Sequence, residues 1–88
     1  MKQGYFEIIE NTALTETVYK MVLKGDVSEI TAPGQFVNIK LDGLYLRRPI
    51  SVCDVSGDTL TIIYKAVGKG TKLMAGMQQG KLDLLTGL

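Results

Sequence analysis

Apolar and polar side chains alternate in short runs along most of this chain, with the two-residue period of β-strands. The clearest run is residues 36–41, where Val37, Ile39 and Leu41 share one face. Similar runs, rich in β-branched and aromatic residues, predict six strands. They cover residues 5–10, 17–24, 36–41, 47–54, 59–65 and 81–85.

Clusters of Gly, Asn, Asp, Ser and Pro predict the turns between these strands. They are Asn11-Thr12, Gly25-Asp26, Ala32-Pro33-Gly34, Asp42-Gly43 and Ser56-Gly57-Asp58. The last of these is the signal of a tight hairpin between the fourth and fifth strands. In that fifth strand, Leu60, Ile62 and Tyr64 face one way, and Thr61, Ile63 and Lys65 face the other.

The pattern changes after residue 67, where Gly68-Lys69-Gly70-Thr71 precedes residues 72–77, a run of good helix formers. We expect a helix of about two turns there, ended by Gly76 and Gly80. Six strands with one short helix between the last two predict an all-β fold, a six-stranded antiparallel Greek-key barrel. The 88 residues suffice for one such domain, over residues 1–88.

Composition excludes several kinds of chemistry. The net charge of +1 gives no basic field for nucleic acid, and the absence of histidine excludes His-based catalytic triads and metal sites within these residues. Cys53 is alone, which excludes an internal disulfide, fits a reducing compartment and predicts a small buried side chain. Without a signal peptide or a membrane-length apolar run, we expect a cytoplasmic protein. The apolar residues 84–88 predict that the chain continues in a longer protein.

Residues 44–54 carry the most unusual pattern, because Arg47 and Arg48 stand beside Pro49 in an apolar strand. Pro49 removes a ladder hydrogen bond, which predicts a sheet edge or a neighbouring bulge. An arginine fork suits phosphate, and the hydroxyl of Ser51 adds a further hydrogen-bonding group. The alternative is an edge strand whose two arginines only keep it soluble and unpaired.

Residues 68–71 form a second candidate phosphate site, because glycines before a helix start leave amide groups free for an anion. The alternative is a plain turn in which Thr71 caps the helix. We expect Arg48 and Thr71 to converge on the two charges of a pyrophosphate.

At these two motifs the chain resembles the flavin-binding barrel of the ferredoxin reductase-like family. The family's run of arginine, a variable residue, usually an aromatic one, and serine or threonine corresponds to Arg48-Pro49-Ile50-Ser51. The run Leu-Arg-Arg-Pro-Ile-Ser, residues 46–51, is similar to a narrower family, the electron-transfer subunits of bacterial NAD-dependent dihydroorotate dehydrogenase, type B. Residues 33–37, 61–65 and 68–71 match in order and spacing, so the resemblance covers nearly the whole chain.

The resemblance implies an FAD site, with Arg48 on the pyrophosphate and Ile50 where the family usually has an aromatic ring. The implied cofactor-binding residues are Arg48, Pro49, Ile50, Ser51, Ile63, Tyr64, Lys65, Gly70 and Thr71. No side chain is expected to act as a catalytic acid or base, and no metal ligand is expected. Strand alternation puts Arg48 and Ile50 on one face, so Ser51 acts through its backbone or the strand is bulged at Pro49.

Relatives in this family carry a nicotinamide-binding domain and a 2Fe-2S cluster domain after the barrel. One cysteine cannot supply the four ligands of such a cluster, so we expect both NAD and the cluster to bind outside these residues. The resemblance also implies a dihydroorotate dehydrogenase catalytic subunit as partner, in a heterotetramer, and a role in pyrimidine biosynthesis. The alternatives are another flavin reductase, a non-catalytic small-barrel binding module and a structural domain with a partner-binding face.

Overall fold

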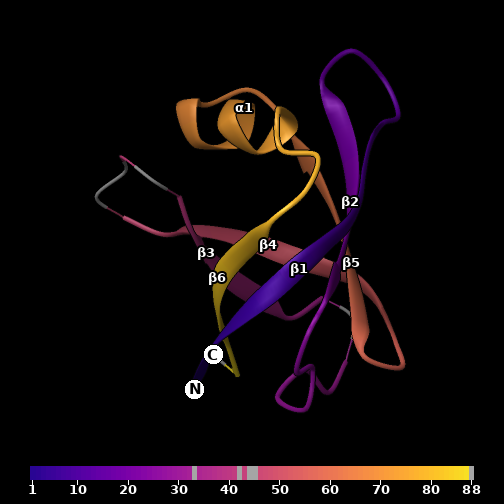
Figure 1. Cartoon of the computed structure of the whole chain (residues 1–88), viewed down its shortest axis with the longest axis vertical. Helices are drawn as coiled ribbons and strands as arrows, with labels where there is room; N and C mark the ends of the chain where they lie inside the picture. The colour runs from indigo at the N-terminus through magenta and orange to yellow at the C-terminus, as the bar shows by residue number, and fades with distance from the viewer. Residues whose placement is uncertain (33, 42, 44–45, 88) are drawn as a thin grey trace.

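The computed structural model describes residues 1–32, 34–41, 43, 46–87 and shows a closed antiparallel barrel with one helix at its end (Figure 1). The elements follow the predicted order. They are β1 (Lys2–Ala13), β2 (Val18–Lys24), β3 (Phe36–Lys40), β4 (Arg48–Ser56), β5 (Thr59–Lys65), α1 (Lys69–Ala75) and β6 (Lys81–Thr86).

The strands close in the order β1-β2-β5-β4-β3-β6, with β6 also paired to β1. Strands β3, β4 and β5 pair in sequence order. Strand β2, which a long connection joins to β3, lies beside β5, and this is the Greek-key arrangement. The predicted barrel and the position of its helix are therefore confirmed. Closure satisfies the strand edges that would remain exposed in so small an open sheet.

Alternate residues of all six strands fill the barrel, as the two-residue period requires. The inward side chains of β3 and β5 are buried as predicted, and α1 inserts Met74 fully into the core. The helix therefore covers one end of the barrel (Figure 1). Within the described residues, no helix is long and apolar enough to cross a membrane.

The first strand is longer than expected, because Asn11 and Thr12 continue β1 instead of forming a turn. Asn11 pairs with Met21 of β2, and its buried amide is satisfied by hydrogen bonds across the barrel end, so a polar residue is tolerated within the strand. The helix also begins earlier than expected, at Lys69. The predicted turns at Pro33 and Asp42, and the start of the arginine stretch at residues 44–45, lie outside the described residues.

Pro49 is in continuous register with β3 on one side, from Ser51 to Arg48, and has no paired residue in β5 on the other, so it lies at a local strand edge as predicted. The bulge lies further along β4, where the register with β5 shifts between Val52 and Asp54. The prediction that Cys53 is buried was wrong, because the alternation turns Val52 inward and leaves Cys53 exposed. A lone apolar residue type does not reveal which face of a strand it occupies.

Candidate functional site

The ladder between β4 and β5 covers only part of both strands. Counted from the hairpin at Gly57, the last described pair between the two strands is Val52 with Ile62. Residues 48–51 are in register with β3 alone, and residues 63–65 are in register with β2 alone. We call residues 48–51 and 63–65 the open seam. Figure 1 shows the two strands diverging from their hairpin toward the end of the barrel that α1 covers.

The β4 side of the open seam combines a cation with a backbone that lacks one donor. Arg48 is exposed at the start of β4, and its side chain forms no hydrogen bond or ion pair with the described residues. Pro49 has no amide hydrogen, so it leaves this edge without one ladder donor. Pro49 and Ser51 are exposed, whereas Ile50 is 9% exposed and belongs to the core, as strand alternation predicts.

Arg47, by contrast, is engaged within the protein. Its Nη1 donates to the carbonyl oxygens of Asp83 at 3.0 Å and Asn38 at 3.4 Å, and its Nη2 contacts Asp83 Oδ1 at 3.1 Å. Burial by itself raises the pKa of the Asp83 carboxyl, but hydrogen bonds from Gln3 and Arg47 and the Arg47 charge hold it below its ordinary value. Arg47 therefore fastens β3 to β6 and is not available to a ligand.

The β5 side of the open seam presents Ile63 and Lys65 outward and Tyr64 inward. The Tyr64 ring stacks on Tyr19, with centroids 5.8 Å apart, and its hydroxyl donates to Asn11 Oδ1 at 2.8 Å. Burial raises the pKa of Tyr64. The Tyr64 hydroxyl is therefore engaged inside the barrel. Its backbone groups point toward β2, because Ala66, two residues later, donates to the carbonyl of Thr17 at 2.6 Å and hydrogen-bonding directions alternate along a strand.

The corner before α1 is organised by Thr71. Its Oγ1 accepts from the amides of Val67 at 3.2 Å and Gly68 at 3.1 Å, and it donates to the carbonyl of Gly68 at 3.2 Å. Gly70 and Thr71 are both buried. The hydroxyl thus closes the turn from the third helical position, whereas the N-cap is Gly68 and not Thr71 as the capping alternative expected. The first helical hydrogen bond is that of the Lys72 amide to the carbonyl of Gly68 at 2.9 Å, so the amides of residues 69–71 have no carbonyl partner within the helix.

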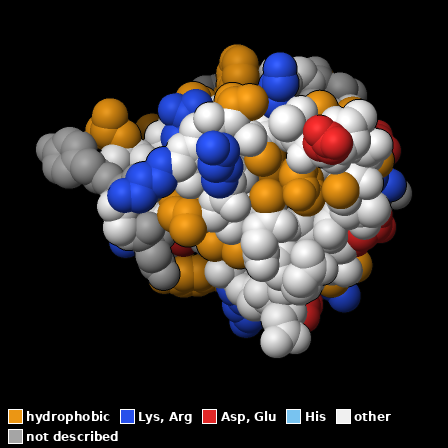
Figure 2. Space-filling model, turned by 90° about the horizontal axis from the view of Figure 1, so that it is seen from above, with side chains coloured by type: hydrophobic (Ala, Val, Ile, Leu, Met, Phe, Trp, Pro, Cys, Tyr) orange, Lys and Arg blue, Asp and Glu red, His pale blue; other side chains and the backbone are white. Residues whose placement is uncertain are grey.

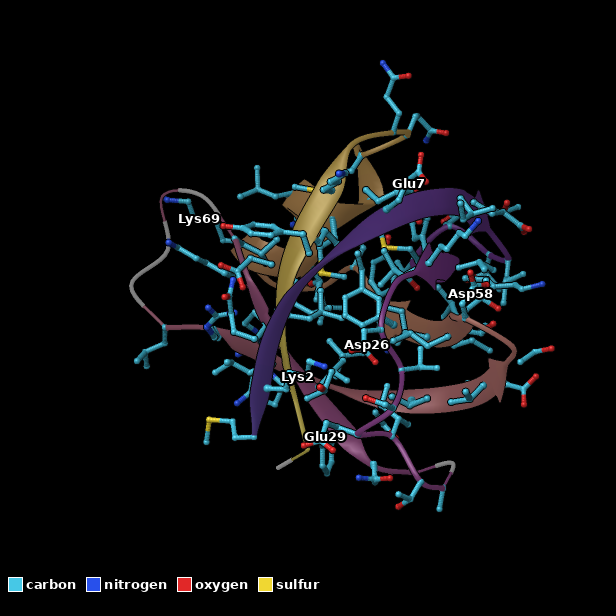
Figure 3. All side chains as sticks on the ribbon, turned by 60° about the horizontal axis from the view of Figure 1, so that its bottom comes forward. Lys2, Glu7, Asp26, Glu29, Asp58 and Lys69 are labelled. Atoms are coloured by element: carbon cyan, nitrogen blue, oxygen red, sulfur yellow. The ribbon has the colours of Figure 1, made fainter. Side chains whose placement is uncertain are left out.

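The start of β4 and the corner before α1 lie on the same side of the molecule. In Figure 1 the start of β4 and the start of α1 are both at the left, and in Figure 3 the labelled Lys69 lies on the side where β4 begins, opposite Asp58. Most Lys and Arg side chains visible from the α1 end gather on one half of that face (Figure 2). Cationic side chains and two incompletely paired strands therefore occur together.

A separate hollow of about 260 Å³ lies elsewhere, over β6 and its neighbours β1 and β3. It is lined by Tyr5, Lys40, Met77, Lys81, Leu82 and Asp83. None of the predicted cofactor-binding residues lines it. Among the described residues there is no cluster of side chains that could hold a metal ion.

Comparisons with known proteins agree with the sequence resemblance. No family model matches the chain. It is 40% identical to the electron transfer subunit of dihydroorotate dehydrogenase B (NAD(+)) from Bacillus velezensis, over 97% of this chain and 36% of the relative. The corresponding subunit from Fusobacterium nucleatum is 49% identical, over 86% of this chain and 32% of the relative. The chain spans about a third of the length of these relatives, and its resemblance to this subunit is confirmed.

The fold is also shared with a solved structure. A ferredoxin NADP+ reductase from Neisseria gonorrhoeae with bound FAD and NADP superimposes with a TM-score of 0.73 and 22% identity. The match covers the whole of this chain and 38% of the reductase chain. The barrel fold is therefore shared with part of that reductase.

Proposed function

We propose that this barrel binds FAD along the open seam and serves as the flavin domain of an electron-transfer subunit. The observation that carries the proposal is the incomplete ladder between residues 48–51 and residues 63–65. A closed barrel that leaves two neighbouring strand edges unpaired provides backbone groups for a ligand. The exposed Arg48 at one end supplies a cation without a protein partner in the described chain.

The residues fit an extended dinucleotide from end to end. The fork of Arg48 suits an oxygen of the pyrophosphate, and the first-turn amides at Gly70 and Thr71 suit the other phosphate. Pro49, Ser51 and the rim of Ile50 would lie along the isoalloxazine ring. Ile50 can form only an apolar wall, because it cannot stack as an aromatic side chain does.

The β5 side would follow the ribityl chain and the edge of the ring. Ile63 and Lys65 would contribute their exposed side chains, and Tyr64 between them would anchor this stretch through its inward ring. The bound flavin would supply the acceptance and release of electrons, and the protein would supply position and electrostatics. These groups therefore bind and orient, and none of them needs to move a proton.

The role of the whole protein is inferred from its relatives. We propose that the complete subunit passes electrons between dihydroorotate oxidation and NAD in pyrimidine biosynthesis, in the cytoplasm, beside a catalytic subunit in a heterotetramer. The single cysteine cannot hold a 2Fe-2S cluster, so the cluster and the nicotinamide site would belong to other parts of that protein.

Titration with FAD, followed by flavin fluorescence, tests the proposal. We expect the wild type to bind and Arg48→Ala to bind at least about tenfold more weakly, the loss expected for a charged hydrogen bond to phosphate. Lys24→Ala is the matched control, because Lys24 is an exposed cation paired with Asp58 at the far hairpin. Absence of binding by the wild type would refute the proposal and favour a non-catalytic binding module.

A further inference from the structure

Asn11 is a polar side chain buried beneath α1. It is 9% exposed, and its Nδ2 donates to the carbonyl oxygens of Met74 at 2.8 Å and Met77 at 2.7 Å. Its Oδ1 accepts from the hydroxyl of Tyr64 at 2.8 Å. Asn11 therefore connects the last turn of α1 to the strand that borders the open seam.

These contacts matter because α1 cannot hold its own position. A seven-residue helix is far too short to be stable in water, so its place depends on tertiary contacts. Met74 anchors it through the core, and Thr71 closes the turn at its start. At the other end, Asn11 adds a side-chain donor to two carbonyl groups, those of Met74 and Met77, of which the first also accepts from the Met77 amide at 3.0 Å.

We propose that Asn11 is a positioning residue that fixes the start of α1 relative to the open seam, and so sets the spacing between the two phosphate contacts. The inference rests on the proposed FAD site and deepens it. Tyr64 belongs to the same device, because its hydroxyl orients the Asn11 amide so that both amide hydrogens point to the helix. Neither side chain needs to touch the ligand.

Two variants and one matched control test the proposal. Asn11→Ala removes all three hydrogen bonds, and Tyr64→Phe removes only the one that orients the amide. Tyr19→Phe is the control, since it removes the same group from the stacked ring and no hydrogen bond of the Tyr19 hydroxyl occurs among the described residues. Each variant is titrated with FAD and with riboflavin, which has the flavin ring but no phosphate.

We expect Asn11→Ala to weaken FAD binding about tenfold, as for the loss of one or two phosphate contacts, with riboflavin affinity unchanged. Tyr64→Phe should show a smaller change of the same kind, and Tyr19→Phe none. The ratio of the two affinities is the decisive quantity, because partial unfolding lowers the binding of both ligands equally. Equal losses for FAD and riboflavin would overturn the proposal.

NMR spectra of the ligand-free protein test the positioning role of Asn11 independently of FAD binding. In ¹H–¹⁵N correlation spectra, Asn11→Ala should move the amide resonances of residues 68–71, at the other end of α1 from the hydrogen bonds it removes. Resonances of residues 68–71 that stay in place would overturn the positioning role. If the wild type binds neither ligand, the proposed FAD function fails, and these spectra still decide whether Asn11 positions the helix start.

Discussion

The adjacent residues Arg47 and Arg48 should separate cleanly into a structural and a ligand-binding arginine. Arg47 makes two hydrogen bonds to carbonyl oxygens and one to the Asp83 carboxylate, and its side chain is 25% exposed while that of Asp83 is 17% exposed. Net contributions of charge-assisted hydrogen bonds are about 1.5–3 kcal/mol. The hydrogen bond from Arg47 to the Asn38 carbonyl is long, and solvent reaches the Arg47–Asp83 ion pair, which weakens both interactions. We therefore expect Arg47→Ala to lower the free energy of unfolding by about 2 kcal/mol.

For a domain of this size such a loss corresponds to a decrease in Tm of about 10 °C, measurable by circular dichroism. Arg48→Ala should change the unfolding free energy by no more than about 0.5 kcal/mol, because the Arg48 side chain is exposed and forms no hydrogen bond or ion pair with the described residues. FAD titration should give the reverse ranking, with Arg48→Ala impaired and folded Arg47→Ala close to wild type. Equal stability losses, or equal affinity losses, would refute this division of roles.

Three further predictions concern the barrel itself. Gly25→Ala should lower the free energy of unfolding, measured in urea, by about 1–3 kcal/mol, because its Cβ would lie 2.7 Å from the buried ring of Phe6. Gly4→Ala should be tolerated, because its Cβ would lie 3.8 Å from that ring. Folding lowers the pKa of Asp83, so the ionised carboxylate should stabilise the fold fully above about pH 3.8, and this stabilisation should be lost as the pH falls through the folded-state pKa. In acid titrations of the unfolding free energy, Asp83→Asn should lack that pH-dependent loss. Cys53 should react with a thiol reagent in the native protein as fast as in urea, and protection would contradict its exposure.

The strand pattern was predictable because burial in a small barrel follows the two-residue period closely. Residues 59–65 form β5 with the predicted bounds and faces, and residues 36–40 do nearly as well. The hairpin between β4 and β5 was equally clear, since Gly57 adopts the positive φ of 59° that its turn signal indicates. Local chemistry alone determines these features.

The features that were missed depend on contacts between distant segments. Asn11 looked like a turn residue, and nothing near it in the sequence reveals the helix carbonyls that it meets 63 and 66 positions later. Arg47 looked equivalent to Arg48 until Asp83 was placed beside it. Pro49 did indicate the β4 edge of the open seam, but nothing in the sequence marks residues 63–65 as the edge that faces it.

Mapping of amide chemical shifts during FAD addition tests the central claim most directly. The account expects the largest changes at residues 48–51, 63–65 and 68–71, which together outline the open seam and the start of α1. Changes confined to the hollow lined by Tyr5, Lys40 and Lys81, or no changes at all, would contradict it.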